Sequence, residues 1–151
     1  MDLILDTHTH TLASGHAYNT INEMAKSAAD KGLKLLAITD HAPAMPGSCS
    51  YMYFLNRRAL KREKYGIRLL FGTELNIINT DGALDLEDYI LKKLDICIAS
   101  IHSPCYKEAT AEQNLNAYIK AMENPYVNII GHPDDGRFPV DMEKLVLAAR
   151  E

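Results

Sequence analysis

The chain has 151 residues, of which 47% are apolar and 24% are charged, and its net charge is −4. These values are ordinary for one soluble globular domain with a hydrophobic core. The acidic balance argues against non-specific nucleic-acid binding, which usually needs a basic patch. It leaves room for a phosphorylated substrate, because bound metal ions can supply local positive charge.

Three cysteines are present, and no two of them form a Cys-x-x-Cys motif. An odd number without that motif disfavours a disulfide framework or a structural zinc knuckle, and fits a reducing compartment. Asp2 stands where a signal peptide needs a basic residue, and the following apolar run is short. No stretch approaches the length of a membrane span. We therefore expect a cytoplasmic protein with no membrane partner.

Short apolar runs alternate with helical patterns along the chain. Thr20 is placed to begin the first helix, with Glu23 three residues later as in a capping box. The dipeptide Asp81-Gly82 predicts a small hairpin within residues 76–84. The expected strands are 3–5, 33–39, 67–71, 95–101 and 127–130, and the expected helices are 20–31, 51–65, 86–94, 110–122 and 141–150.

The repeated strand–helix order predicts parallel strands joined by crossover helices, and therefore an α/β fold. The strands are short and almost continuously apolar, which fits a sheet buried on both faces, with 3–5 as a buried first strand. In such folds the carboxyl ends of the strands converge on one face, and active sites are built there.

The motif Asp6-Thr7-His8-Thr9-His10 follows the first apolar run. In an extended segment residues i and i+2 point to the same side, so His8 and His10 present two imidazoles together. Two neutral imidazoles on one face are half of a site for zinc, manganese or iron. The pair alone is a weak signal, since His-x-His also occurs in exposed polar turns.

One histidine or glutamate follows each expected strand. These residues are spaced by 31, 33, 28 and 30 positions, which is one strand–helix unit each. Five of the six histidines in the chain lie at strand ends, and the sixth, His16, lies in the first loop. The residues spaced in this way are His10, His41, Glu74, His102 and His132.

With His8 and His16, the candidate ligands number seven, more than the three or four that a single zinc ion uses. Two or three divalent ions therefore fit better, with the Glu74 carboxylate as a bridge. Multinuclear sites of this kind catalyse hydrolysis of phosphoesters, esters or amides.

The ordered motifs resemble the PHP (polymerase and histidinol phosphatase) family, and most closely its YcdX-like phosphatase subgroup. The resemblance runs from residue 1 to about 150 and implies a distorted (βα) barrel, three metal ions, often zinc, and phosphoester hydrolysis. Family members have seven strands, so residues 1–151 would form an incomplete barrel, about five of seven βα units and the N-terminal two thirds of the family domain. We expect self-association to cover its open side. The motifs are Asp6-Thr7-His8-Thr9-His10, His16, Ile38-Thr39-Asp40-His41, Gly72-Thr73-Glu74, His102 and Gly131-His132-Pro133.

The resemblance also implies how the ligands divide among the metals. The first ion would use His8, His10 and Glu74, and the second would use Glu74, His102 and His132. The third would use His16 and His41. The family's final Asp-x-His motif is absent from this sequence, which leaves the third ion with two protein ligands.

Other residues have weaker claims on the site. Asp6 and Asp40 would orient neighbouring imidazoles by accepting hydrogen bonds from ring N–H groups, although both also suit turns or caps. Arg137, soon after His132, is a candidate for holding substrate phosphate. The basic run Arg57, Arg58, Lys61 and Arg62 is expected to be a solvated helix face.

The function that these observations predict is hydrolysis of a small phosphomonoester by a metal-bound hydroxide at a multinuclear His/Glu site. A first alternative is a metal-binding remnant with little or no catalysis, which the missing ligands favour. A second is an amidohydrolase, although those enzymes bridge their metals with a lysine and no lysine ends a strand here. A proofreading nuclease is a third, with no basic groove in its favour.

Overall fold

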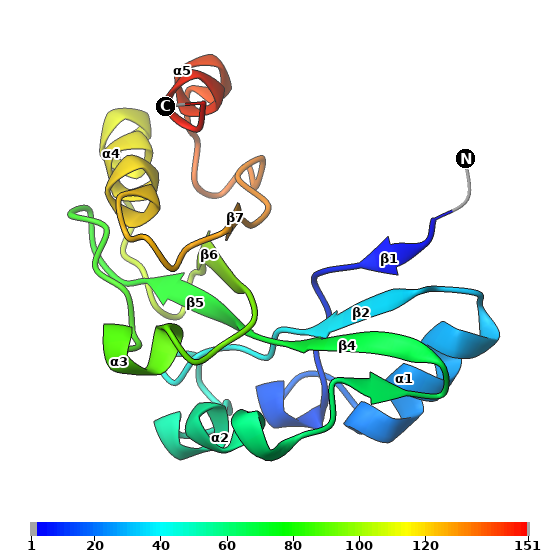
Figure 1. Ribbon diagram of the computed structural model, residues 1–151. Helices are drawn as coiled ribbons and strands as arrows, with labels where there is room; N and C mark the ends of the chain where they lie inside the picture. The colour runs from blue at the N-terminus through cyan, green and yellow to red at the C-terminus, as the bar shows by residue number, and fades with distance from the viewer. Residues whose placement is uncertain (1–2, 151) are drawn as a thin grey trace.

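Two sheets of mainly parallel strands form the centre of the computed structural model, which describes residues 3–150 (Figure 1). In the first sheet the strand order is β1-β2-β4-β3, with β3 antiparallel to β4. In the second sheet the order is β5-β6-β7, and all three strands are parallel. The bounds are β1 Leu5–Asp6, β2 Leu35–Ile38, β3 Glu63–Lys64, β4 Ile67–Phe71, β5 Thr73–Ile77, β6 Cys97–Ile101 and β7 Ile129–Ile130.

A single residue, Gly72, joins the two sheets. It separates β4 from β5, so the chain leaves one sheet and enters the other almost without interruption. A side chain at this position would place its Cβ 1.9 Å from the backbone oxygen of Ile96, so only glycine allows this close approach. An isolated parallel bridge between His41 and Glu74 continues the pairing across the junction. The junction thus places Glu74 in the middle of the fold.

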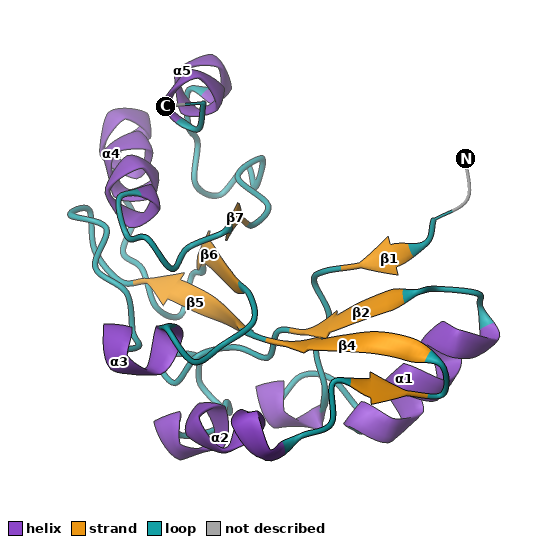
Figure 2. Ribbon diagram, viewed as in Figure 1, coloured by secondary structure: helices purple, strands orange, loops and turns teal. Residues whose placement is uncertain are grey.

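The helices lie outside the strands (Figure 2). The two longest, α1 and α4, both begin with a complete capping box, in which Thr20 pairs with Glu23 and Thr110 with Gln113. Each box satisfies backbone N–H groups that a helix start leaves free. The bounds are α1 Ile21–Asp30, α2 Tyr51–Asn56, α3 Asp88–Leu91, α4 Ala111–Met122 and α5 Met142–Ala148, with short 3₁₀ turns η1 Leu12–Ser14 and η2 Arg57–Ala59.

Three apolar clusters fix the helices to the sheets. In the first, Ala25 and Ala28 of α1 pack against β2 and β4. In the second, α4 and α5 pack together beside β5 and β6. The third lies below the junction, where Phe54 of α2 meets Leu75 of β5 and Leu91 of α3. Along these helices and strands, the pattern of buried and exposed residues follows the spacing of the apolar residues in the sequence.

The alternating strand–helix order and the parallel pairing confirm the predicted α/β class, but several expected elements differ. The run at residues 3–5 is not buried, because Leu3, Ile4 and Leu5 are 72%, 53% and 45% exposed at the outer edge of the first sheet. The expected helix at 51–65 ends early and gives way to η2 and β3. The backbone becomes extended at Leu60, and Arg57 just before it turns inward and is 1% exposed.

The hairpin expected at residues 76–84 is only partly present. Its turn exists, with Gly82 at a φ of 75° and one antiparallel bridge between Ile77 and Leu84. Its first residues instead belong to β5, which pairs with β6 over five positions. Glu74 therefore lies within a strand rather than after one, unlike the histidines. Within residues 3–150, no helix has the length and apolarity needed to cross a membrane.

Candidate metal centre

Glu74 is the centre of a cluster of imidazoles. Its side chain is 1% exposed, and five ring nitrogens lie within 2.9–3.2 Å of its two carboxylate oxygens. On one side, Oε2 is 3.1 Å from the Nε2 atoms of His8 and His10 and 3.1 Å from Nδ1 of His41. This carboxylate oxygen thus gathers histidines from the ends of both β1 and β2.

The other oxygen, Oε1, faces the second sheet. It lies 3.2 Å from Nε2 of His102 and 2.9 Å from Nε2 of His132, which follow β6 and β7. Ser100 of β6 donates its hydroxyl hydrogen to the same oxygen at 2.7 Å. Each carboxylate oxygen therefore serves one sheet, and Glu74 lies between two groups of ligand atoms.

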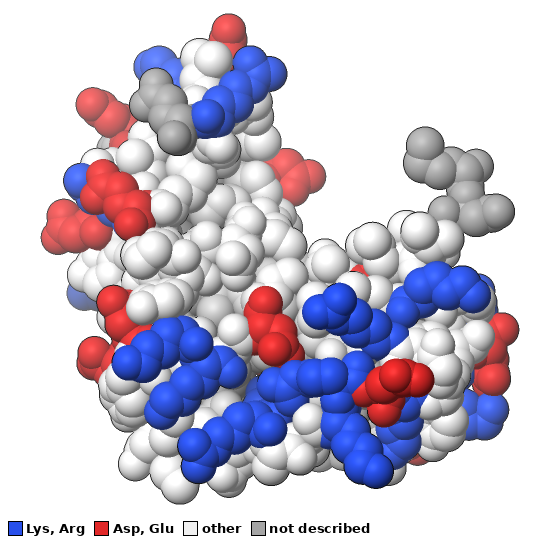
Figure 3. Space-filling model, in the orientation of Figure 1, with Lys and Arg blue, Asp and Glu red and all other residues white. Residues whose placement is uncertain are grey.

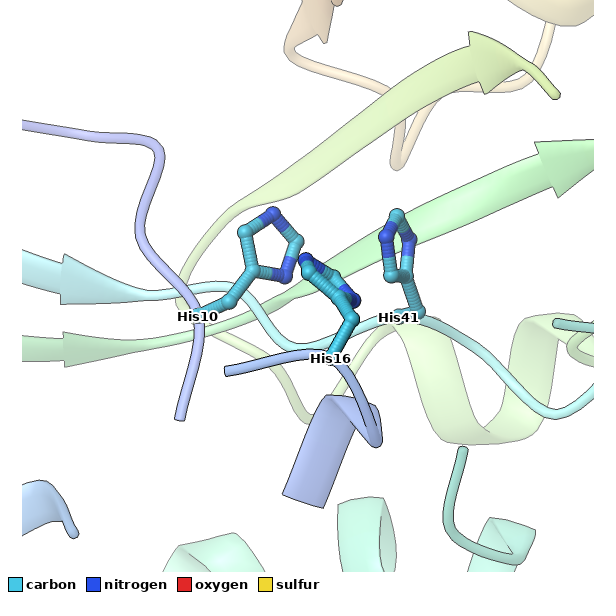
Figure 4. Close-up of side chains that lie close together, drawn as sticks. All are labelled: His10, His16 and His41. Atoms are coloured by element: carbon cyan, nitrogen blue, oxygen red, sulfur yellow. The ribbon is translucent and has the colours of Figure 1, made fainter. Parts of the chain in front are cut away.

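His16 joins the cluster from the loop after η1. Its ring lies 5.0 Å, between centroids, from both His10 and His41 (Figure 4). Nδ1 of His16 lies 3.3 Å from the backbone oxygen of Ser14, which can only accept, so the geometry favours a proton there and a free Nε2. The loop therefore adds one imidazole, which forms a third group with His10 and His41.

Three trios of these residues bring one ligand atom each within 4.8 Å of the others, counting only residues 3–150. The trio His8, His10 and Glu74 is the group expected for a first ion. The other two differ from expectation because His41 takes part in both. It completes a trio with His10 and His16, which gives that group three protein donors instead of two. It also replaces His132 in the trio with Glu74 and His102, although His132 remains 2.9 Å from Oε1.

The electrostatics of the cluster favour an ionised Glu74 carboxylate and a neutral His41 ring. Burial opposes the ionisation of Glu74, but its side-chain contacts with the rings of His10, His102, His132 and His8 outweigh it and hold its pKa well below the ordinary range. For His41, burial lowers the pKa to about 3, against the opposing attraction of Glu74. A buried neutral imidazole beside a carboxylate is in the protonation state that a metal ligand requires.

His132 has an unusual backbone conformation and a raised pKa. It has a φ of 31°, in a region that residues other than glycine rarely adopt. Its pKa is raised, first by its hydrogen bond to Glu74. The preceding Gly131 lies so close to β6 that a Cβ there would be 2.2 Å from Oγ of Ser100. The chain thus accepts local strain to bring His132 to the carboxylate.

The donor set fits divalent cations of the zinc, manganese or iron type. A carboxylate beside five imidazoles is an N/O ligand set that these ions prefer. One ring nitrogen, Nδ1 of His41, is buried and has no hydrogen-bond partner among residues 3–150, although it is 3.1 Å from Oε2 of Glu74. A buried nitrogen without a hydrogen bond is costly unless its lone pair binds something else. The residues present therefore suit a metal.

Asp6 and Asp40 contact the cluster, but neither accepts the expected hydrogen bond from an imidazole N–H group. Asp6 accepts a hydrogen bond from the backbone N–H of His8 at 3.1 Å. Asp40, which is fully buried, accepts from the hydroxyl of Ser14 at 2.8 Å, and that hydroxyl oxygen lies 3.1 Å from Nδ1 of His10. Asp40 therefore acts on His10 through Ser14.

A buried ion pair supports the loop that carries these ligands. Arg57 lies 2.6 Å from Oδ2 of Asp40, and its guanidinium also donates to the backbone oxygens of Ile38 and Gly72. Burial of Asp40 opposes its ionisation, but Arg57 and hydrogen bonds from Thr11 and neighbouring side chains lower its pKa. The expectation that Arg57 belongs to a solvated face is therefore wrong, while the adjacent Arg58 is exposed.

Arg137, the candidate for phosphate contact, is 68% exposed and held by a neighbouring carboxylate. Its Nε and Nη2 atoms donate to Asp135 at distances between 2.6 and 3.1 Å, and Nη1 lies 3.3 Å from Oγ of Ser103. This contact turns the guanidinium toward the loop after β6, where His102 lies. Its role in substrate binding stays a prediction.

Three polar residues that touch the cluster were not predicted from the sequence. Ser100 and Asn76 lie two positions from His102 and Glu74, so the alternation of a strand places them on the same face as those ligands. They are also register partners between β5 and β6. The i, i+2 rule that identified His8 and His10 would have identified both. Ser14 had no comparable signal, because its role depends on the turn of η1.

Comparison with known proteins places this geometry in a family. The PHP domain model matches residues 6–151. The chain is 51% identical over 152 residues to a protein named probable phosphatase from Thermoanaerobacter sp. (strain X514), and 47% identical over 151 residues to another of that name from Acetivibrio thermocellus. Both alignments cover 100% of this chain, but only 62% and 63% of those relatives.

One solved structure shares the fold. It is a histidinol phosphate phosphatase from Lactococcus lactis, complexed with zinc, L-histidinol and phosphate, and it superposes with a TM-score of 0.57. The alignment covers 97% of this chain and 65% of that one at 22% sequence identity, so it bears on the fold alone. The family match over nearly the whole sequence, together with this shared fold, shows that the chain belongs to the PHP domain family.

Proposed function

We propose that the protein is a metal-dependent phosphoesterase that hydrolyses a small phosphomonoester. The observation that carries the proposal is the convergence of five ring nitrogens on the two oxygens of Glu74, at 2.9–3.2 Å. The printed names of the relatives, which describe phosphatases, support the same class of reaction. The chain spans about three fifths of those relatives, so the activity of the whole protein is part of the proposal.

We propose two to three divalent ions, with zinc first and manganese or iron as alternatives. Oε2 of Glu74 with His8 and His10 would hold one ion, and Oε1 with His102 and His132 would hold another. His16 and His41, joined by His10, would hold a third. When bound, these ions would supply positive charge to the phosphate oxygens and lower the pKa of water.

The chain's own residues supply orientation and charge. Glu74 keeps its negative charge inside the cluster, and Ser100 holds one of its oxygens in place at 2.7 Å. His8 and His132 are the most open of the rings around Glu74, 31% and 38% exposed, so substrate would approach from their side. Arg137 lies on the loop after His132 and is placed to meet a phosphate oxygen if it exchanges its contact with Asp135.

The competing functions have less support. An amidohydrolase would need a bridging lysine, and Glu74 occupies that place. A nuclease would need a basic surface leading to the histidines. Basic side chains do gather on the face shown in Figure 3. Four basic residues also line a pocket of about 840 Å³. That pocket lies at the amino ends of β2 and β4, whereas the histidines lie at the carboxyl ends. The four are Lys34, Lys61, Arg62 and Arg68.

One experiment distinguishes an active phosphatase from a metal-binding remnant with little or no catalysis. Purified protein is loaded with zinc or manganese, its metal content is measured, and hydrolysis of an aryl phosphate is followed in parallel with His102→Ala. The enzyme predicts two or more ions per chain and turnover that falls by at least about a hundredfold in the variant, the scale set by loss of a group that stabilises the transition state. One ion or none, without turnover, supports the remnant.

We also propose that the protein self-associates through the outer edge of the first sheet. Leu3, Ile4 and Leu5 on that edge are about half exposed or more, and an exposed apolar edge strand invites pairing. Sedimentation or light scattering at micromolar concentration should give a mass above 16.9 kDa. A monomer throughout that range would contradict the proposal, and Ile4→Lys should lower the mass if the edge is the contact.

The three cysteines, Cys49, Cys97 and Cys105, are all free thiols, and burial raises the pKa of Cys97 to about 12. Free, unreactive thiols suit a reducing compartment, so we propose a cytoplasmic location.

A further inference from the structure

We infer that Asp85, acting through Asn76, positions His102 as a ligand through its Nε2 atom. The inference rests on the metal-dependent function proposed above, and it concerns residues that contribute no ligand atom themselves. Asn76 is fully buried in β5, and Asp85 lies in the segment between β5 and α3. Neither residue belongs to the motifs by which the family resemblance was drawn.

The orientation of the Asn76 amide is fixed by its neighbours. Its Nδ2 donates to Oδ2 of Asp85 at 2.6 Å and to the backbone oxygen of Ala42 at 3.2 Å. Neither an ionised carboxylate nor a carbonyl can donate a hydrogen bond, so the amide nitrogen must face them. Its oxygen, Oδ1, then necessarily faces the ring of His102, 2.8 Å from Nδ1.

This orientation determines which nitrogen of His102 can bind a cation. An amide oxygen only accepts hydrogen bonds, so the contact at 2.8 Å favours a proton on Nδ1. The other nitrogen, Nε2, lies 3.2 Å from Oε1 of Glu74, inside the cluster. A ring that binds metal through Nε2 must keep its proton on Nδ1, and an acceptor there holds the plane of the ring.

Asp85 is itself anchored rather than free to move. Its Oδ1 accepts the backbone N–H of Asn76 at 2.8 Å, and its Oδ2 accepts the backbone N–H of Ala44 at 2.8 Å. Ala44 lies three residues after His41, so one carboxylate ties together the segments that carry two ligand candidates. If Asp85 only stabilised its own turn, it would not need the hydrogen bond from Ala44, which lies in the loop after β2 of the first sheet.

A second carboxylate in the same cluster is used in the same way. Oγ of Ser14 donates its single hydrogen to Asp40 at 2.8 Å, so it can only accept from Nδ1 of His10 at 3.1 Å. His10 is thereby directed to use Nε2, which lies 3.1 Å from Glu74. The arrangement carboxylate–neutral residue–imidazole therefore occurs once on each side of Glu74, which supports a positioning role for Asp85 and Asn76.

Two variants test the inference. Asn76→Leu keeps the size of the side chain but removes the acceptor at Nδ1, and Asp85→Asn removes the carboxylate that fixes the amide. Each should weaken zinc binding about 10–100-fold, the usual effect of removing a partner of a metal-bound histidine, measured by competition with a chelating dye. In zinc-loaded protein labelled with ¹⁵N-histidine, the Nδ1–H of His102 should be protected from exchange in the parent and exposed in both variants.

Asn114→Leu is the matched control. Asn114 is also a fully buried asparagine, and it donates to the backbone oxygen of Pro139 between α4 and α5, away from the cluster. Its replacement should lower stability and leave zinc affinity and the His102 signal unchanged. If Asn76→Leu fails to fold, Asp85→Asn carries the test alone.

The outcomes separate the inference from the proposed function. Parent-like zinc affinity and a parent-like Nδ1–H signal in the folded variants would overturn the inference while leaving the phosphatase proposal intact. Zinc binding that depends on Asn76, without any phosphate hydrolysis, would overturn the proposed function and support the inference. A parent protein that binds none of zinc, manganese and iron would overturn both.

Discussion

Replacing Glu74 with glutamine should remove most of the bound metal. The substitution keeps the size of the side chain but removes the negative charge that both ligand groups share, on Oε2 with His8 and on Oε1 with His132. We expect zinc affinity to fall by more than about a hundredfold, beyond the effect of losing an outer hydrogen-bond partner, and phosphatase activity to fall with it. Metal content after dialysis, measured by mass spectrometry, is the primary readout.

Glu112→Gln is the appropriate control for Glu74→Gln. Glu112 is an exposed glutamate in the first turn of α4, and its replacement should leave metal content unchanged. If Glu74→Gln retains the metal content of the parent, the bridging role of Glu74 is wrong. Loss of only one of several ions would restrict that role to one carboxylate oxygen.

Replacing Arg57 with leucine should destabilise the protein by about 3–5 kcal/mol, the usual cost of leaving a buried charge without its partner. Asp40 is fully buried and would keep its charge among Thr11, Ser14 and Tyr53 without the guanidinium 2.6 Å away. The bonds from Arg57 to the strand ends at Ile38 and Gly72 would be lost as well. Urea unfolding of the parent and of Arg57→Leu measures this difference in the free energy of unfolding, provided that both proteins show the same dependence of that free energy on urea concentration.

The adjacent Arg58 supplies a matched control, because it is exposed and its replacement by leucine should change stability by no more than about 0.5 kcal/mol.

The pH dependence of stability gives a second test of the Asp40–Arg57 ion pair. The pKa of Asp40 is lowered on folding, so its ionisation stabilises the parent above the ordinary pKa of aspartate. That contribution is lost as pH falls through the lowered pKa, so the gap between parent and Arg57→Leu should narrow in acid. A gap that stays constant down to acid unfolding would contradict this account.

The α/β class and the convergence of the candidate ligands could be predicted from the sequence because both depend on local periodicity. Apolar runs at intervals of about thirty residues indicate parallel strand–helix units, and parallel strands bring their carboxyl ends together. His10, His41, His102 and His132 follow their strands at these ends, and the structure brings all four to the same carboxylate. The helix starts at Thr20 and Thr110 could be predicted for the same reason, because a capping box involves only four neighbouring residues.

Tertiary structure decided what depends on contacts between distant segments. Gly72 breaks one long strand into β4 and β5 because Ile96 passes against its backbone, and this break places Glu74 between two sheets. The burial of Arg57 follows from its pairing with Asp40, 17 positions earlier, a contact that no helical period reveals. The partition of His41 between two groups of ligands depends on the relative orientation of both sheets. The sequence by itself therefore determined which residues meet, since strand ends converge in any parallel fold. Only the folded chain decided which oxygen each imidazole faces, because that depends on how Glu74 of β5 is packed against side chains that follow four other strands.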